Sequence, residues 1–234
     1  MKLNRRGLWA VGACLAVGFV AASLADGPVY HAIDPSLASR ERLDGAWWYL
    51  ALRHCGSLLT WLLLGIAVLT LDRVRRRPER PEHLAVRGPY IAVAAGIAGL
   101  AAELGKLIIA RERPATIQTL ESGVEALVYQ GYHFRGLFAG FADGSNLGLP
   151  SSHAATAAGG AFALAMVWPK LWPLALGIAV GCGVSRLLTG AHFASDVYAG
   201  IVLGWLVAVW FGRGLLKPRP RPTASGTITG DSPA

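Results

Sequence analysis

Six long apolar segments run through this chain of 234 residues and leave little outside them to build a soluble domain. They lie at about residues 8–25, 46–71, 90–110, 152–168, 171–188 and 194–212. A helix needs roughly 20 apolar residues to cross the hydrocarbon core of a bilayer. Charged residues make up 15% of the chain, whereas a soluble domain carries about 25%. We therefore expect an all-α polytopic membrane protein, a bundle of six transmembrane helices, with close packing among the last three because they are rich in Gly and Ala.

The distribution of Lys and Arg predicts the orientation of this bundle. Most of the 22 basic residues precede the first segment, separate the second from the third, or follow the last. In a six-span chain these positions share one side of the membrane, and Lys and Arg favour the cytoplasmic side. We expect both termini in the cytoplasm and the loops at about 26–45, 111–151 and 189–193 outside. The net charge of +8 is thus explained by topology, and no nucleic-acid partner is expected.

The two ends of the chain are interpreted separately. Residues 1–25 resemble a signal peptide, but the apolar stretch of roughly 18 residues is longer than is usual for one, which favours a retained helix. Residues 217–234 are rich in Pro, Ser, Thr and Gly and predict a disordered cytoplasmic tail. The remaining residues 1–216 form one membrane domain. Three scattered cysteines, at positions 14, 55 and 182, predict neither a disulfide framework nor a metal cluster.

Lys106 and Arg113 close the third apolar segment in the sequence KLIIARERP. Seven residues are close to two helical turns, so a continuous helix presents both cations on one face. Pro114 disfavours a helical conformation at Arg113, which places that residue where the helix breaks. No acid is positioned to neutralise both cations, and the pair predicts an anion site. The alternative is that both side chains merely anchor the helix end at the membrane surface.

The sequence PSSH at 150–153 opens the fourth segment. Ser is a preferred N-cap, and the free backbone N–H groups at a helix start bind anions. His153 falls in the first turn, where the helix dipole disfavours its protonation. A bound phosphate would offset the dipole and hold His153 charged, as a general acid requires. The alternative is simply a capped helix.

Arg186, His192 and Asp196 connect the fifth and sixth segments. His192 and Asp196 are four residues apart and share a face on a helix. The carboxylate can then accept one imidazole N–H and leave the other ring nitrogen as a nucleophile. A turn at Thr189-Gly190 would let Arg186 point to the same place. The alternative is a helix cap with a structural ion pair.

All three clusters fall on the non-cytoplasmic side of the predicted topology, at the membrane interface. Together they provide three cations, a helix N-terminus, two histidines and one carboxylate. This combination suits phosphoryl transfer, in which stabilising the equatorial oxygens dominates catalysis. None of the clusters has the ligand spacing of a metal site, so we expect no metal and no cofactor.

These residues resemble the three motifs of the type 2 phosphatidic acid phosphatase superfamily, K-x6-R-P, P-S-G-H and S-R-x5-H-x3-D. The resemblance covers residues 106–196 and implies a metal-independent reaction. It implies that His192 attacks phosphorus to form a phosphohistidine, that Asp196 orients its ring, and that His153 protonates the leaving oxygen and then activates water. It also assigns phosphate binding to five further positions: Lys106, Arg113, Ser151, Ser152 and Arg186. Ser152 stands where the family has glycine, which places a side chain next to the phosphate.

The sequence therefore predicts an integral membrane lipid phosphatase of a bacterial inner membrane, with its site facing the periplasm or exterior. Candidate substrates are phosphatidylglycerol phosphate, phosphatidic acid, undecaprenyl pyrophosphate and lipid A phosphate, and the residues do not choose among them. A phosphotransferase between lipids would use the same site.

Readings from other classes fit less well. A transporter would spread its charges through the depth of the membrane, whereas here only Glu103 is deep. A vanadate haloperoxidase has a similar anion pocket but a soluble fold. Headgroup selectivity is expected in the loop 115–149, with His133 and Arg135, and around Trp47–His54, unless these are only interfacial anchors. The oligomeric state is not predicted.

Overall fold

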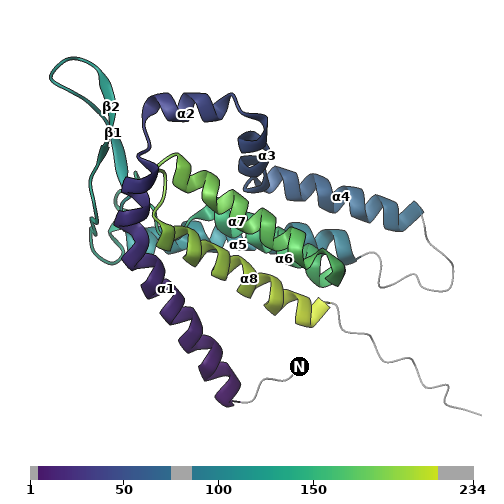
Figure 1. Ribbon diagram of the computed structural model, residues 1–234. Coiled ribbons are helices and arrows are strands. Elements are labelled where there is room, and N and C mark those ends of the chain that lie inside the picture. The colour runs from purple at the N-terminus through teal and green to yellow at the C-terminus, as the bar shows by residue number, and fades with distance from the viewer. Residues whose placement is uncertain (1–4, 75–85, 216–234) are drawn as a thin grey trace, which may run out of the picture.

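The computed structural model describes residues 5–74 and 86–215 (Figure 1). The tail expected at 217–234 and most of the basic segment after the second apolar run lie outside these residues. The helices are α1 (Arg5–Ile33), α2 (Leu37–Asp44), α3 (Trp47–Cys55), α4 (Leu58–Val74), α5 (Arg87–Ile109), α6 (Ser152–Val167), α7 (Trp172–Leu188) and α8 (Ala194–Leu215). The strands are β1 (Ala115–Thr119) and β2 (Glu125–Tyr129), and short 3-10 turns lie at Ala139–Phe141 and Pro169–Leu171.

All six apolar runs are helical, as predicted. Four helices are long and apolar enough to cross a membrane, namely Gly7–Ile33, Arg87–Ile109, Pro169–Leu188 and Ala194–Gly214. The bent pair α3 and α4 passes the same test only when taken together, and α6 is a shorter apolar helix of 16 residues. By length and composition, the described residues therefore contain four candidate spans, or five with the bent pair.

The expectation of one continuous helix over 46–71 is wrong. The helix breaks at Gly56 and Ser57, and α3 and α4 meet at 75°. Gly56 ends α3, and the side chains of Thr60 and Trp61 donate to the carbonyls of His54 and Cys55 at 2.7 Å each, which satisfies the end of the helix. Hydropathy does not detect such a break because both halves are apolar.

Helix α6 lies at the centre of the bundle, packed against α5, α7 and α8. Its middle consists almost entirely of buried Ala and Gly. A Cβ added to Gly159 would lie 2.8 Å from the carbonyl oxygen of Ala94, and one added to Gly204 would lie 2.5 Å from that of Ala155. The predicted close packing of small residues is thus confirmed for α6 and α8.

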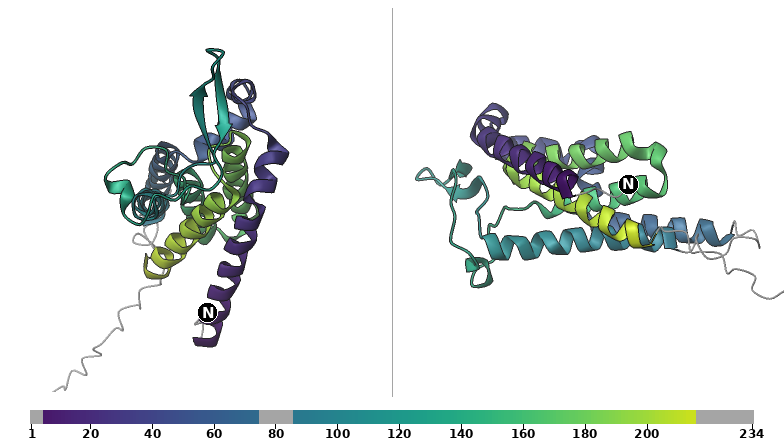
Figure 2. Two further views of the ribbon diagram at one scale, coloured as in Figure 1. Left: turned by 90° about the vertical axis from the view of Figure 1, so that its left-hand side faces the viewer. Right: turned by 90° about the horizontal axis from the view of Figure 1, so that it is seen from below.

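The fold is not purely helical, because β1 and β2 form an antiparallel hairpin. Ala115 pairs with Tyr129 and Thr119 with Glu125. The strands contain β-branched and aromatic residues, and Gly123, with φ +78°, supplies the turn between them. The hairpin lies in the loop expected outside the membrane and projects from the bundle near α2 (Figures 1 and 2).

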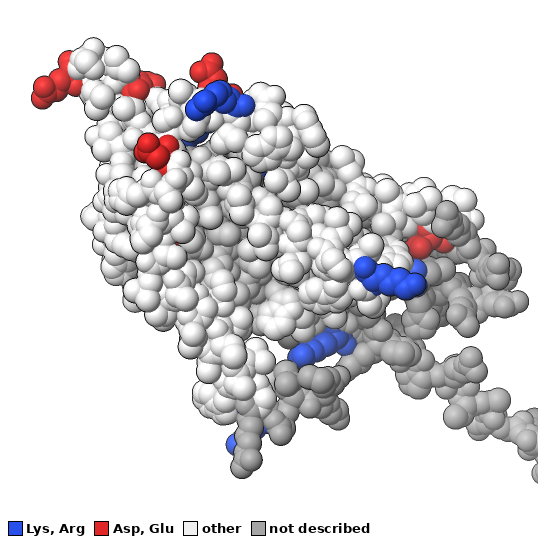
Figure 3. Space-filling view, in the orientation of Figure 1, with Lys and Arg blue, Asp and Glu red and all other residues white. Residues whose placement is uncertain are grey.

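The two ends of the bundle differ in composition. The hairpin and α2 lie at one end, whereas the start of α1 and the end of α8 lie at the other (Figure 1). Most of the visible Asp and Glu side chains lie at the hairpin end, where basic side chains also lie. An uncharged surface separates this end from the opposite one, where Lys and Arg side chains lie near an acidic side chain (Figure 3). The uncharged zone exposes large apolar side chains of α1, α4, α5, α7 and α8, as expected of a surface in contact with lipid.

Candidate functional site

The three polar clusters converge at the hairpin end of the bundle. Lys106 comes from the last turn of α5, His153 from the first turn of α6, Arg186 from the last turn of α7, and His192 from the turn before α8. Lys106, Arg186 and His192 all lie close enough to His153 to interact with it electrostatically. Arg113 acts in the same way on His192. The predicted site residues therefore form one group, although they come from different helices and from the loops beside them.

The turn predicted at Thr189-Gly190 brings His192 back beside Arg186. Gly190 has φ +60°, and its N–H donates to the carbonyl of Leu187 at 2.8 Å. The N–H of Ala191 donates to the carbonyl of Arg186 at 3.1 Å. A left-handed residue is required here, which explains the glycine.

His192 and Asp196 are in contact, but not on one helix as expected. Helix α8 begins at Ala194, so His192 precedes it and Asp196 lies in its first turn. His192 Nδ1 is 3.4 Å from Asp196 Oδ2 and has no other partner among the described residues. Asp196 also accepts the N–H of Phe193 at 2.9 Å. The carboxylate thus caps the helix and faces the imidazole at the same time, so the two interpretations of this pair do not exclude each other.

The environment of His192 keeps its imidazole neutral. Its side chain is 1% exposed, and burial lowers the pKa of His192 to about 4. Asp196 acts in the opposite direction, but the charges of Arg186 and Arg113 lower this pKa further. A neutral imidazole with Nδ1 directed at a carboxylate leaves Nε2 available for nucleophilic attack.

Arg111 and Asp26 complete the support of Asp196, and the sequence reasoning missed both. Arg111 Nη2 donates to Asp196 Oδ1 and, at 2.8 Å, to Ser195 Oγ. Asp26 from α1 accepts the backbone N–H of Ser195 at 2.8 Å, and it also accepts the Ser195 hydroxyl. Arg111, Asp26 and Asp196 are all buried. A lone acid directly after the first apolar run and a third cation in KLIIARERP were the available signals.

Two aromatic rings enclose the Arg111 guanidinium. Its centre lies 5.3 Å from the Tyr132 ring and 5.1 Å from the Phe193 ring, and the two rings stack on each other with centroids 4.8 Å apart. The Tyr132 hydroxyl donates to Asp26. Burial and the neighbouring Asp26 carboxylate raise the pKa of Tyr132, so this hydroxyl stays protonated. The loop after the hairpin is thereby fixed to α1 and α8 around the site.

Lys106 has an acidic neighbour on its own helix. Its Nζ donates to Glu103 Oε1 at 2.9 Å and to Ser152 Oγ at 3.0 Å. Glu103 pairs with Lys106 but not with Arg113, so no acid among the described residues forms an ion pair with both cations, as expected. Ser152, which replaces the family's glycine, adds a hydrogen bond to the lysine.

Arg113 does not continue the helix that carries Lys106. Helix α5 ends at Ile109, and Ala110 is left-handed with φ 52°. The N–H of Arg113 donates to the carbonyl of Asn146 at 2.9 Å. Neither Arg113 nor Arg186 forms an ion pair with a described residue, and Arg186 Nε is buried without a hydrogen-bond partner there. Two uncompensated guanidinium groups are suited to an anion.

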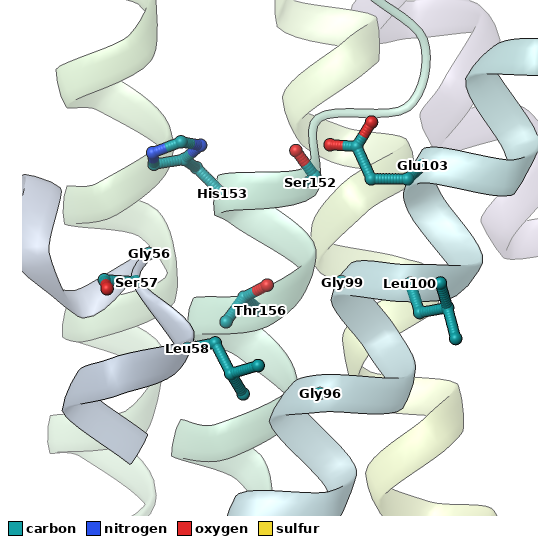
Figure 4. Close-up of a pocket in the computed structure, with 10 residues that line it drawn as sticks. All are labelled: Gly56, Ser57, Leu58, Gly96, Gly99, Leu100, Glu103, Ser152, His153 and Thr156. Carbon is teal, nitrogen blue, oxygen red and sulfur yellow. The ribbon is translucent and has the colours of Figure 1, made fainter. Parts of the chain in front are cut away.

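The start of α6 has the predicted form. Ser151 is the N-cap, and its side chain accepts the N–H of Ala154 at 3.5 Å, while its own N–H donates to the carbonyl of Asp196 at 3.0 Å. The N–H groups of Ser152 and His153 precede the first intrahelical bond and remain for a ligand. A cavity of about 480 Å³ lies below them, between α5, α6 and the bend after α3. Glu103 and Ser152 stand at its top, with His153 on the other side of the first turn (Figure 4).

The outer-loop residues singled out for headgroup selectivity have structural partners. Glu112 accepts from Arg135 and lies 3.1 Å from His133 Nδ1, and Arg135 also bonds Asp143 at 2.8 Å. On α3, Trp47 and Trp48 are exposed, as interfacial anchors would be.

No three His, Cys, Asp or Glu side chains in the described ranges are grouped so as to hold a metal ion.

Residues 88–220, more than half of the chain, match the sequence model of the PAP2 superfamily. The chain belongs to the PAP2 superfamily. It is 30% identical over 186 residues to a lipid A 1-phosphatase of Rhizobium johnstonii, covering 70% of each chain. It is 28% identical over 190 residues to a lipid A 1-phosphatase of Rhizobium etli, covering 71% of this chain and 75% of the relative.

The fold is similar to that of a solved PAP2 enzyme. The crystal structure of a transmembrane phosphatidylglycerolphosphate phosphatase from Bacillus subtilis matches with a TM-score of 0.54 at 20% identity. The match covers 86% of this chain and 94% of that one. With its apolar helices, this likeness identifies the chain as an integral membrane protein of the same fold.

Proposed function

We propose that this chain is a lipid A phosphatase, which removes the phosphate at the 1-position of its lipid. The broader activity, a membrane lipid phosphatase, follows from the family and from its lipid A 1-phosphatase relatives. The observation that carries the proposal is the position of His192, directed by Asp196 and surrounded by the cations of Arg113 and Arg186. Lipid A 1-phosphate is favoured over the other candidate substrates because both relatives are named lipid A 1-phosphatases.

The reaction has two displacements. His192 Nε2 attacks phosphorus, the bond to the lipid oxygen breaks, and His153 gives its proton to that oxygen. His153 then takes a proton from water, and the resulting hydroxide attacks phosphorus and breaks its bond to His192 Nε2. Inorganic phosphate leaves, and His192 is regenerated. Asp196 stabilises the charge that develops on the His192 ring. Lys106, Arg113 and Arg186 bind the equatorial oxygens, together with the Ser152 hydroxyl and the first N–H groups of α6. Ser151 caps that helix.

Substrate binding requires a rearrangement at two points. The His192 side chain is 1% exposed, so neighbouring side chains must move to admit a phosphoryl group. Lys106 is held by Glu103, and it must exchange this carboxylate for a phosphate oxygen. The change at Lys106 exchanges one ionic partner for another, which limits its net cost.

We further propose six spans, with α3 and α4 counted as one and α6 as another, and a site that faces the periplasm of a bacterial inner membrane. The basic ends of α1 and α8 support a cytoplasmic location for the opposite end of the bundle (Figures 1 and 3). Residues 1–216 would form a single domain.

Phosphate release from a lipid panel tests this function. The purified protein in detergent is given lipid A, phosphatidic acid, phosphatidylglycerol phosphate and undecaprenyl pyrophosphate, with and without EDTA. We expect release from lipid A to be fastest, unaffected by EDTA, and abolished in His192→Ala but not in His133→Ala, a control at an exposed loop histidine. Activity that disappears in EDTA, or persists in His192→Ala, would overturn the mechanism. Transfer to a second lipid instead of water would indicate a phosphotransferase.

A further inference from the structure

A second cavity, of about 300 Å³, lies beside the site at the foot of the hairpin. Two cations line it, Arg40 from α2 and Arg113 from the loop after α5, together with Thr116 and Asn146. Ala191, the residue before His192, forms part of its wall. The lining contains no Asp or Glu. The sequence motifs do not include Arg40, and the reaction proposed above does not use it.

The two guanidinium groups lack an anionic partner. Within residues 5–74 and 86–215, neither Arg40 nor Arg113 forms an ion pair. The nearby Asp44 is bonded to Arg53 at 2.9 Å instead. Arg40 is half-buried, and burial lowers its pKa, with the charge of Arg113 acting in the same direction. Two like charges around one cavity repel each other, and an anion between them would reverse the sign of that interaction.

The cavity is held in shape by bonds to its walls. Arg40 Nε donates to the carbonyl of Thr189 at 2.6 Å, which ties α2 to the turn before His192. The N–H of Arg113 donates to the carbonyl of Asn146 at 2.9 Å. Thr116 Oγ1 accepts from Gln130 Nε2 at 2.7 Å, so its own hydroxyl hydrogen can point into the cavity. Two guanidinium groups, a hydroxyl and an amide form a donor set suited to a tetrahedral oxyanion.

We propose that Arg40 and Arg113 form a second subsite for a phosphate-type oxyanion, adjacent to the one at His192. The inference rests on the proposed function, because Arg113 would then bind the reacting phosphate on one side and the second anion on the other. Arg113 acts electrostatically on both His192 and Arg40, as expected of a residue between them. The occupant is either a second phosphate on the lipid headgroup or the released inorganic phosphate before it leaves.

Binding of radiolabelled inorganic phosphate to the purified protein tests the subsite without relying on activity. We expect two phosphates per wild-type chain, one in Arg40→Gln, and two in both Arg40→Lys and Arg42→Gln. Arg42 is an exposed arginine on the same helix and away from the cavity, so it controls for loss of charge. One phosphate in the wild type, two in Arg40→Gln, or equal losses in Arg40→Gln and Arg42→Gln would each overturn the proposal.

Should Arg40→Gln bind no phosphate at all, Thr116→Val replaces it as the test variant. It removes a donor from the hairpin side of the cavity and leaves the charges in place. Weaker binding of the second phosphate only, by several-fold, would support the subsite. Unchanged binding of both phosphates would contradict it.

Kinetics then separate the two sources of the anion. If the second anion belongs to the headgroup, Arg40→Gln raises the KM for a bisphosphorylated lipid on the order of tenfold more than for its monophosphorylated form. If the second anion is the product, Arg40→Gln weakens inhibition by inorganic phosphate by a similar factor. If Arg40→Gln caused neither of these two changes, the proposal of a second subsite would be overturned. A wild-type protein that binds two phosphates but releases none from any lipid would refute the proposed function and leave the subsite standing.

Discussion

Asp196 is the residue on which the most interactions in the site depend. It faces His192, accepts the N–H of Phe193 and is bonded to Arg111, although it is completely buried. A buried carboxylate is stable only when such partners surround it. Arg111 lies between Asp196 and Asp26, so a single guanidinium compensates two acids.

Replacing Arg111 should therefore cost both stability and rate. Arg111→Met leaves two buried carboxylates without their cation, and we expect a loss of about 3–5 kcal/mol in the free energy of unfolding. We also expect a lower kcat with little change in KM, because the His192 ring loses its support and not its substrate. Thermal unfolding in detergent and steady-state kinetics measure the two effects.

Arg135→Met serves as the control for that experiment. Arg135 forms two ion pairs in the outer loop, away from Asp196, and pairs of this kind contribute about 0–1 kcal/mol. Equal effects of the two substitutions would show that Arg111 has no particular role.

The lowered pKa of His192 has a consequence for stability. The folded protein protonates this imidazole only near pH 4, whereas the unfolded chain does so near pH 6.5, the ordinary pKa of histidine. Between these values the unfolded state binds the extra proton, so stability falls as the pH falls from 6.5 to 4. We expect the unfolding midpoint to drop over this range by less in His192→Gln than in the wild type, and an equal drop would argue against a buried neutral imidazole.

At the scale of elements, the bend between α3 and α4 brings backbone close to His153, the proposed general acid. A Cβ added to Gly56 would lie 2.9 Å from His153 Cβ and 3.0 Å from Cys182 Sγ. A longer, straight helix over 46–71 would carry this segment away from α6. The bend therefore belongs to the construction of the site.

Gly56→Ala should displace His153 and lower kcat on the order of tenfold or more, since small misplacements of catalytic groups are costly. Gly45 offers a matched control, because Gly45 and Gly56 both follow a short helix and both have φ −83°. A Cβ on Gly45 meets only the carbonyl oxygens of Arg42 and Glu41, at 3.6 and 4.0 Å. Initial rates of phosphate release should stay within about twofold in Gly45→Ala, and equal losses in both variants would rule out a specific contact with His153.

The sequence predicted those features of the elements that depend on local patterns of apolar and charged residues. Apolar length indicated the six apolar helical runs but not α2, a polar helix within the expected loop 26–45. The cost of charge at a membrane edge located Lys106, His153, Arg186, His192 and Asp196. The contact between Arg111 and Asp196 joins residues 85 positions apart, and the bond from Ser195 to Asp26 spans 169. Such pairs depend on how helices pack, which a local pattern does not contain. The β1–β2 hairpin was missed because the loop 115–149 was interpreted only as a region of headgroup selectivity or as interfacial anchors.

At the scale of the whole molecule, the charges at the two ends predict its orientation. A single cysteine introduced at Ser122, in the turn of the hairpin, should react with a membrane-impermeant maleimide in intact spheroplasts. One introduced at Arg213, at the far end of α8, should react only after lysis. Both are measured against the parent with Cys14, Cys55 and Cys182 replaced, and the reverse labelling pattern would place the site in the cytoplasm.

The central claim is that His192 takes the phosphoryl group before water does. The most direct test is the stereochemistry at phosphorus, measured with a chirally labelled phosphate ester hydrolysed in isotopically labelled water. Two successive in-line displacements each invert the configuration, so attack by His192 followed by water predicts overall retention. Inversion would show that water attacks the substrate directly, and it would contradict the nucleophilic role of His192.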